Sequence, residues 1–207
     1  MARVLLVGAA LVALLAGCDP ATDGLSAQSA RILVLSRTAG YRHASIEPAI
    51  EALRARAREA GVGLDATEDP EVFRPSELAR YRAVVFLSTT GDVLAEPEQA
   101  ALEAYVRGGG GFAGIHSAAD TEYDWPWYGE LVGAYFESHP PGVHEATLHV
   151  IDRTHPATAS LPDPWTRSDE WYDFRDVQPG LHALLAIDEH TYKDPADAAP
   201  ESRPIAW

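Results

Sequence analysis

The stretch at residues 108–124, GGGGFAGIHSAADTEYD, decides how the rest of this sequence is interpreted. Four glycines follow a helical pattern, and the short apolar run at 112–115 then predicts a buried strand that ends at His116. Ligands of open α/β sheets bind beyond the carboxyl ends of the strands. His116 is therefore the first candidate for chemistry, and the alternative is a histidine that caps the strand and bonds locally.

Upstream of this stretch, apolar runs alternate with helical patterns. Residues 31–36 (RILVLS), 62–67 and 83–88 (AVVFLS) predict strands, and helical spacing follows Ser45, Pro75 and Glu96. This alternation predicts a parallel sheet with right-handed crossovers. The loops at 38–43, 88–92 and 116–124 would then emerge at one edge of that sheet.

Downstream of Trp125 the pattern changes. Residues 144–151 (HEATLHVI) alternate polar and apolar, which predicts an exposed antiparallel strand, and 184–188 predict another. Residues 203–207 resemble the start of a strand, so we expect a fragment that lacks its last elements. The expected fold class is α/β, a three-layer sandwich with a mostly parallel central sheet and a more irregular, partly antiparallel C-terminal portion.

The N-terminus has the features of an export signal. The apolar run at 4–15 is too short for a permanent membrane span and suits a signal-peptide core. Residues 15–18 (LAGC) resemble a bacterial lipobox, so we expect a lipoprotein signal peptide at 1–17 and lipidation of Cys18. The alternative is an ordinary secretory signal with a chance cysteine. A polar tether at 18–30 and one domain at 31–207 would follow, anchored to the cell envelope through the lipid alone.

The charge balance restricts the partners. Lys+Arg total 16 and Asp+Glu total 31, a net charge of -15, which argues against electrostatic binding to nucleic acid or to anionic lipids. Nothing in the sequence indicates a nucleotide cofactor. A neutral or cationic small molecule, or a metal ion, is the expected partner.

Three histidines and one acid are candidate site residues, because each falls on a predicted loop or strand end. Imidazoles with a carboxylate suit Zn²⁺ with an open position, or Mn²⁺ or Fe²⁺. We predict His43, His116 and His139 as metal ligands, and His116, Glu170 and Asp120 as catalytic groups. Asp120, Glu122 and Asp124 all follow His116 closely enough for one of them to orient its imidazole, and Asp120 is preferred. His155, by contrast, is expected to be a turn residue.

An ordered succession of motifs from Arg31 to the end of the chain resembles the ThuA-like, or trehalose-utilisation, family. The motifs are Gly40-x-x-His43-x-Ser45-Ile46, Gly111-Phe112-x-Gly114-Ile115-His116, Trp127-Tyr128-x-x-Leu131-x-Gly133, Phe136-x-x-His139-Pro140, Asp152-x-x-His155-Pro156 and Asp169-Glu170-x-Tyr172. The resemblance implies a flavodoxin-like fold related to class I glutamine amidotransferases. His116 occupies the place of their cysteine nucleophile, and Cys18 is the only cysteine, so amidotransferase chemistry is not expected.

The resemblance also implies a link to disaccharides and 3-keto sugars. We therefore expect an enzyme that abstracts a proton next to a sugar carbonyl, with the enediolate stabilised by a metal or by a cationic histidine. Tyr41, Trp127, Trp171 and Tyr172 are the predicted sugar contacts, with core packing as the alternative for the tryptophans. Other functions left open are a non-catalytic carbohydrate-binding or interaction module, a serine-type hydrolase using Ser117, and glycoside hydrolysis by two carboxylates.

Overall fold

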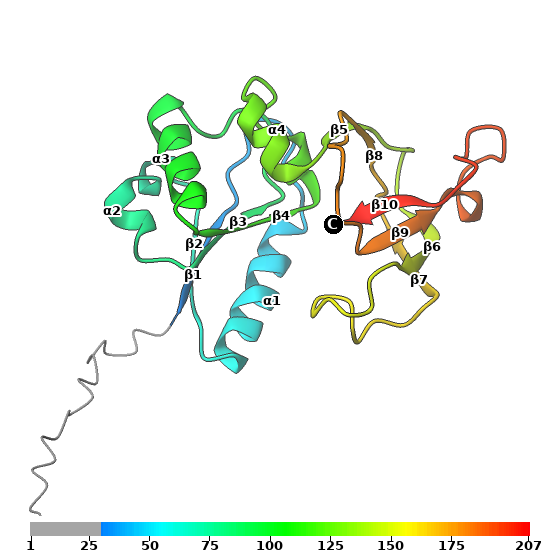
Figure 1. Cartoon of the computed structure of the whole chain (residues 1–207), viewed down its shortest axis with the longest axis horizontal. Coiled ribbons are helices and arrows are strands. Elements are labelled where there is room, and N and C mark those ends of the chain that lie inside the picture. Colours follow the sequence, from blue (N-terminus) through cyan, green and yellow to red (C-terminus); the bar gives the residue numbers. More distant parts are fainter. Residues whose placement is uncertain (1–29) are drawn as a thin grey trace, which may run out of the picture.

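The computed structural model describes residues 30–207 (Figure 1). The predicted signal peptide, lipidated Cys18 and nearly all of the tether lie outside the described residues. Among the helices that are described, none combines the length and apolar character needed to cross a membrane. Residues 30–132 form what we name the parallel half, and residues 133–207 form the C-terminal half.

The parallel half is built on a four-stranded sheet. Its strands are β1 (Arg31–Leu35), β2 (Gly63–Thr67), β3 (Ala83–Leu87) and β4 (Gly111–Ile115), in the order β2-β1-β3-β4. All neighbouring pairs are parallel. The order matches the first four strands of the flavodoxin-like arrangement, so the predicted α/β class with a parallel central sheet is confirmed.

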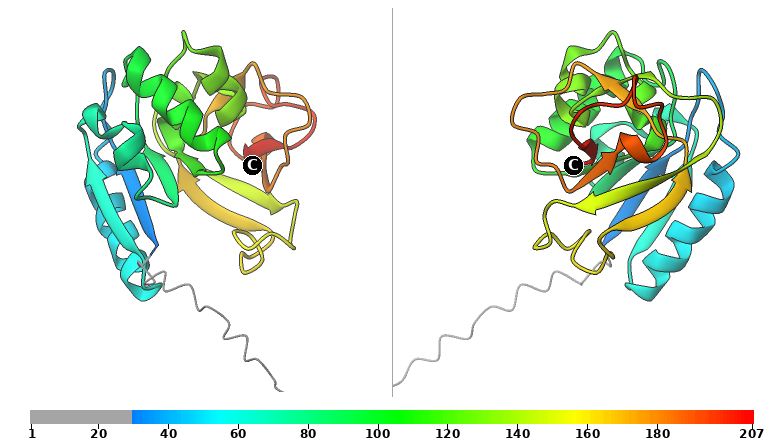
Figure 2. Two further views of the ribbon diagram at one scale, coloured as in Figure 1. Left: turned by 60° about the vertical axis from the view of Figure 1, so that its left-hand side comes forward. Right: turned by 90° about the vertical axis from the view of Figure 1, so that its right-hand side faces the viewer.

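Helices cover both faces of this sheet (Figure 2). Helix α1 (Ile46–Glu59) lies on one face, and the short helices η1 (Pro70–Val72) and α2 (Pro75–Leu78) lie on the other with α3 (Glu96–Arg107). Buried side chains of β1 and β3, among them Leu35 and Phe86, pack with Leu102 of α3. Right-handed crossovers from a strand order of this kind require this division of the helices.

The glycine run after α3 has a steric cause. Gly109 has a φ of +95°, and a Cβ added at Gly110 would lie 2.2 Å from the ring of Tyr105. The strand predicted at 112–115 is observed as β4, but it is not buried, because Ala113, Gly114 and Ile115 are exposed. Strand β4 is the last strand of the sheet, and these residues line a cavity.

The connection from β4 to the C-terminal half contains η2 (His116–Asp120) and α4 (Pro126–Val132). The C-terminal half then forms a two-stranded sheet from β5 (Tyr135–Ser138) and β8 (Asp173–Arg175). Its larger sheet has the order β10-β9-β6-β7 and is antiparallel throughout. The strands of that sheet are β6 (His144–Val150), β7 (Trp165–Asp169), β9 (Leu185–Asp188) and β10 (Arg203–Ala206), with the short helix η3 (Glu189–Thr191) after β9. The predicted antiparallel C-terminal portion is thus observed.

Candidate active site

His43 comes from the loop between β1 and α1, and β3 determines where that loop goes. The backbone N–H of Ala39 donates to the carbonyl of Thr90 over 2.7 Å, and the N–H of Gly40 donates to Thr90 Oγ1 over 3.1 Å. These bonds carry the chain across the carboxyl end of β3 toward β4. His43 is therefore placed beside the end of a strand that is not adjacent to its own.

His116 stands at a sharp turn between β4 and η2. Its φ of +54° lies in the left-handed region, which costs a residue with a side chain roughly 1–3 kcal/mol. Two hydrogen bonds to backbone carbonyl groups fix this turn. Thr121 Oγ1 donates to the carbonyl of Ser117 over 3.1 Å, and the N–H of Gly91 donates to the carbonyl of Asp120 over 2.8 Å. The fold thus imposes an unfavourable backbone conformation on His116, whose imidazole contacts His43 and Glu170.

The remaining groups come from the C-terminal half. Glu170 follows β7 directly, and His139 follows β5. The ring of Tyr172 packs between the two histidines, with its centroid 4.4 Å from that of His116 and 5.7 Å from that of His139. The four residues predicted to converge, His43, His116, His139 and Glu170, therefore do so where the two halves meet.

Three donor atoms form a tight triangle. His116 Nε2 lies 3.0 Å from Glu170 Oε2 and 3.1 Å from His43 Nε2, and His43 Nε2 lies 3.4 Å from the same carboxylate oxygen. If both Nε2 atoms carried a hydrogen, the two hydrogens would crowd the space between the imidazoles. If only one Nε2 carried a hydrogen, the lone pair of the other would face the negatively charged carboxylate. A cation inside the triangle would satisfy all three atoms, and this group could hold one.

The protonation state of His116 fits that arrangement. Burial lowers the pKa of His116 below its usual value, with the neighbouring His43 acting in the same direction and Glu170 opposing it. A neutral imidazole has a lone pair to offer to a metal ion. Ser117 Oγ lies 3.4 Å from His43 Nδ1, where a hydrogen bond would orient that second ring.

His139 has a position different from the one predicted. Its Nδ1 donates to the carbonyl of Pro140 over 2.9 Å, and its Nε2 lies 3.5 Å from Glu170 Oε1, the oxygen that does not face the triangle. The potential metal-ligand group comprises His43, His116 and Glu170, whose ligand atoms all lie within 4.8 Å of one another. His139, predicted as a ligand, lies outside this group, whereas Glu170, predicted as a catalytic group, lies within it.

Several other candidates lie elsewhere. Asp120 Oδ1 accepts from the hydroxyl of Tyr123 over 2.5 Å, and its charge helps to raise the pKa of Tyr172, which packs on His116. Trp127 packs against Trp125 and beneath the guanidinium of Arg107. It does not line the cavity that begins at His116 and Glu170. Core packing, the alternative interpretation, therefore describes Trp127.

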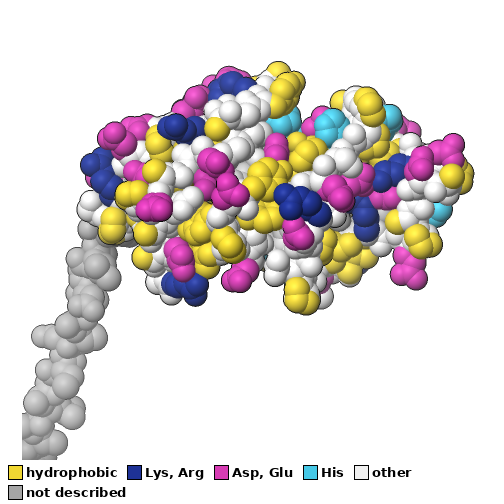
Figure 3. Space-filling view, turned by 90° about the horizontal axis from the view of Figure 1, so that it is seen from above, with side chains coloured by type: hydrophobic (Ala, Val, Ile, Leu, Met, Phe, Trp, Pro, Cys, Tyr) yellow, Lys and Arg dark blue, Asp and Glu magenta, His cyan; other side chains and the backbone are white. Residues whose placement is uncertain are grey.

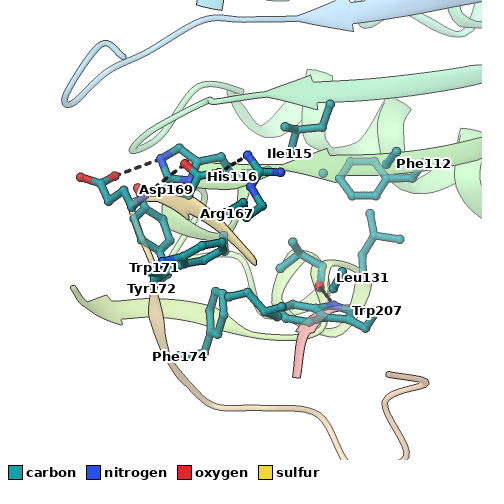
Figure 4. A pocket seen from close by; sticks show the side chains of 18 residues that line it. Phe112, Ile115, His116, Leu131, Arg167, Asp169, Trp171, Tyr172, Phe174 and Trp207 are labelled. Carbon is teal, nitrogen blue, oxygen red and sulfur yellow. Dashed lines mark hydrogen bonds and ion pairs between the residues drawn. The ribbon is translucent and has the colours of Figure 1, made fainter. Parts of the chain in front are cut away.

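The remaining aromatic candidates surround the site. Tyr41 is 72% exposed and sets its ring edge against His43. Trp171 and Tyr172 are buried, yet both line a cavity of about 610 Å³ that begins at His116 and Glu170 (Figure 4). In the view of Figure 3, a group of apolar side chains lies near the middle of the molecular surface, and histidine side chains lie toward its upper side. Arg167 and Trp207 also line the cavity and were not predicted, because nothing in their local sequence distinguishes them.

These features define the class of protein: an α/β fold with a histidine and carboxylate centre at the carboxyl edge of a parallel sheet. The family model for trehalose utilisation, ThuA, matches residues 31–207. The chain therefore belongs to the ThuA family, and this membership suggests a carbohydrate-related function.

Two solved structures have a similar fold. A ThuA-like protein from Bacteroides uniformis superposes with a TM-score of 0.72 at 22% identity, covering 90% of this chain and 79% of that one. A ThuA-like protein from Parabacteroides merdae gives a TM-score of 0.63 at 20% identity, covering 85% of this chain and 73% of the other. A search of curated proteins found no match.

Proposed function

We propose that this protein is an enzyme of carbohydrate metabolism that acts on a sugar or keto sugar by metal- or histidine-assisted acid/base chemistry, at a site formed by His43, His116, His139 and Glu170. The observation that carries the proposal is the triangle of His43 Nε2, His116 Nε2 and Glu170 Oε2, with separations of 3.0–3.4 Å. Two imidazoles and one carboxylate form a ligand set used by catalytic metal sites with open positions. Membership of the trehalose-utilisation family is the reason for proposing a carbohydrate as the substrate.

The donor set fits a small divalent ion such as Zn²⁺, Mn²⁺ or Fe²⁺. Bonds from zinc to nitrogen and oxygen are about 2.0–2.2 Å long, so donor atoms this close together suit one ion. His43, His116 and Glu170 would hold it, each from a different segment of the chain. A bound ion would supply Lewis acidity toward a substrate carbonyl.

His139 is the one of these four residues that lies outside the potential metal-ligand group, so we assign it the role of proton carrier. Because its Nδ1–H is bonded to Pro140, its Nε2 is the atom free to gain or lose a proton, and this atom faces Glu170 Oε1 at 3.5 Å. A base at this position would take the proton from a carbon next to the sugar carbonyl. Glu170 would then stabilise the resulting imidazolium.

The alternatives have weaker support. A serine-type hydrolase would need an accessible Ser117, but this residue is 0% exposed. Glycoside hydrolysis would need a second free carboxylate, whereas Asp169 is paired with Arg167 over 2.6 Å and Asp120 is bonded to Tyr123. A carbohydrate-binding module without catalysis remains the second candidate, because the aromatic rings at the site serve binding as well as reaction.

The test separates catalysis from binding. Glucosides, disaccharides and their 3-keto derivatives would be incubated with the wild type, with and without a chelator, and the products analysed by mass spectrometry. His139→Gln should reduce turnover by about 10²- to 10⁴-fold, which is the contribution of a general base, and leave metal content unchanged. His155→Gln is the matched control, since His155 is an exposed turn residue that caps Ala157. Sugar binding without conversion by the wild type would instead establish the binding module.

A further inference from the structure

The segment between β7 and β8 brings two side chains to the site. Glu170 and Tyr172 both belong to this segment, and the residue that separates them, Trp171, anchors it. Trp171 is buried in the apolar core of the C-terminal half, and its Nε1 donates to the carbonyl of His144 over 2.7 Å. Because its anchor is buried and hydrogen-bonded, the segment holds Tyr172 in a defined place.

The ring of Tyr172 contacts two imidazoles that have different tasks in the proposed function. Its centroid lies 4.4 Å from that of His116, a potential metal ligand, with 30° between the ring planes. It lies 5.7 Å from that of His139, the proton carrier, with 25° between the planes. Phe136 of β5 supports the same ring at a centroid distance of 4.4 Å. Tyr172 is only 5% exposed, so most of its surface is used in packing.

The carboxylate of Glu170 links the same two histidines but cannot fix their ring planes. Its Oε2 lies 3.0 Å from His116 Nε2, and its Oε1 lies 3.5 Å from His139 Nε2. The χ2 torsion of a histidine has broad minima, so one contact at Nε2 leaves the ring free to rock, whereas a ring packed against the imidazole plane restricts that motion.

We infer that Tyr172 is a positioning residue, whose ring holds the imidazoles of His116 and His139 in the orientations that metal binding and proton transfer require. This inference rests on the proposed function, which gives the two histidines those tasks. It assigns the effect to the aromatic ring of Tyr172 and not to its hydroxyl group.

The test compares Tyr172→Phe, which keeps the ring, with Tyr172→Leu, which removes it. Calorimetric titration of the metal-free proteins with Zn²⁺ should show a loss of at least about tenfold in affinity for Tyr172→Leu, because groups that orient a ligating imidazole commonly contribute about 10- to 100-fold. Tyr172→Phe should stay within about threefold of the wild type. Circular dichroism checks folding, and Tyr172→Met, with a flexible apolar side chain, carries the test if Tyr172→Leu misfolds.

A second measurement on the same variants needs no metal. The ring current of Tyr172 displaces the NMR signals of protons on the imidazoles that it contacts. In the metal-free protein, the signals of His116 and His139 should therefore move in Tyr172→Leu and stay near their wild-type positions in Tyr172→Phe.

Tyr192→Leu is the matched control. Tyr192 is a partly buried tyrosine of the same half, and its ring centroid lies 6.1 Å from that of His144, outside the site. The control should leave Zn²⁺ affinity and the signals of His116 and His139 unchanged. A control that weakens Zn²⁺ binding as much as Tyr172→Leu does would overturn the inference, because the loss would then come from the stability of the whole half.

Three other results would also overturn the inference. They are a Tyr172→Leu variant that binds Zn²⁺ as tightly as a Zn²⁺-binding wild type, a Tyr172→Phe variant as weak as Tyr172→Leu, and signals of His116 and His139 that do not move in Tyr172→Leu. Failure of the proposed function would look different. The wild type would then convert no sugar or bind no Zn²⁺, while the signals of the metal-free variants would still decide whether Tyr172 orients the two imidazoles.

Discussion

Each half of the molecule buries one glutamate, and the two are held in different ways. Glu122, in the parallel half, is 1% exposed. Its carboxylate accepts the backbone N–H groups of Val93 and Leu94 over 2.8 and 2.7 Å and the amide of Gln99 over 2.6 Å. Two of these three donors are backbone groups whose positions are set by the loop between β3 and α3.

Glu189, in the C-terminal half, is 3% exposed and is held mainly by cations. Its Oε1 pairs with Arg203 and lies 3.2 Å from Lys193 Nζ, and both cations also contact Asp173. The apolar core around it has six buried residues, compared with fourteen in the main cluster, thirteen of which belong to the parallel half. The parallel half is therefore a packed scaffold, whereas the C-terminal half, which supplies Glu170 and His139, depends on a network of charges.

The largest expected effect is in that charge network. Glu189→Ala leaves Arg203 and Lys193 without their buried partner, and removing one member of a buried ion pair costs about 3–5 kcal/mol. Urea unfolding should show this loss, and hydrogen exchange should show that β9 and β10 lose protection first. Glu59→Ala breaks an exposed pair with Arg56 and should change stability by less than about 0.5 kcal/mol. Equal effects of the two changes would remove the distinction drawn between the halves.

A smaller loss is expected in the parallel half. Glu122→Ala leaves the N–H groups of Val93 and Leu94 buried without acceptors, which should cost about 2–3 kcal/mol. Because these donors are neutral, the difference in stability between variant and wild type should hardly change between low and high salt. A strong salt dependence, measured by thermal unfolding, would mean that Glu122 also depends on charges.

The smallest effect concerns acid stability. The pKa of Asp152 is held well below its usual value, first by the hydroxyl and then by the backbone N–H of Thr154, with His182 contributing. A carboxyl whose pKa is lower in the folded state stabilises the protein above its unfolded value of 3.8, and this stability is lost as the pH falls below that point. Asp152→Asn should therefore flatten the fall of Tm between pH 5 and about pH 2. An unchanged slope would contradict the assignment.

The sequence predicts the parallel half more accurately than the C-terminal half. Strands β1 and β3 are covered on both faces, so residues 31–36 and 83–88 carry continuous apolar runs. Strand β4 was predicted as a strand, but its exposure was not predicted, because an edge strand has the same local pattern as a central one. Glu122 gives no local signal of burial either, since the donors it meets lie about 28 residues away in the chain.

The sequence predicted which residues converge on the site, but not the directions and contacts of their side chains. His43, His116, His139 and Glu170 stand at strand ends or in loops, and the parallel topology brings the first two together. Nothing in the sequence states that the imidazole of His139 is bonded to Pro140, or that Trp127 faces Arg107 instead of the cavity. Those outcomes depend on side-chain direction, which is fixed by packing between distant segments.

The central claim is that the two halves build one metal centre together, with His116 from one and Glu170 from the other. The most direct measurement is calorimetric titration of the metal-free wild type with Zn²⁺ and Mn²⁺, repeated on His116→Ala and Glu170→Ala. We predict one ion per chain in the wild type and a loss of at least about tenfold in affinity in each variant, because three ligands are reduced to two. A wild type that binds neither ion, or variants that bind as tightly as the wild type, would contradict this account.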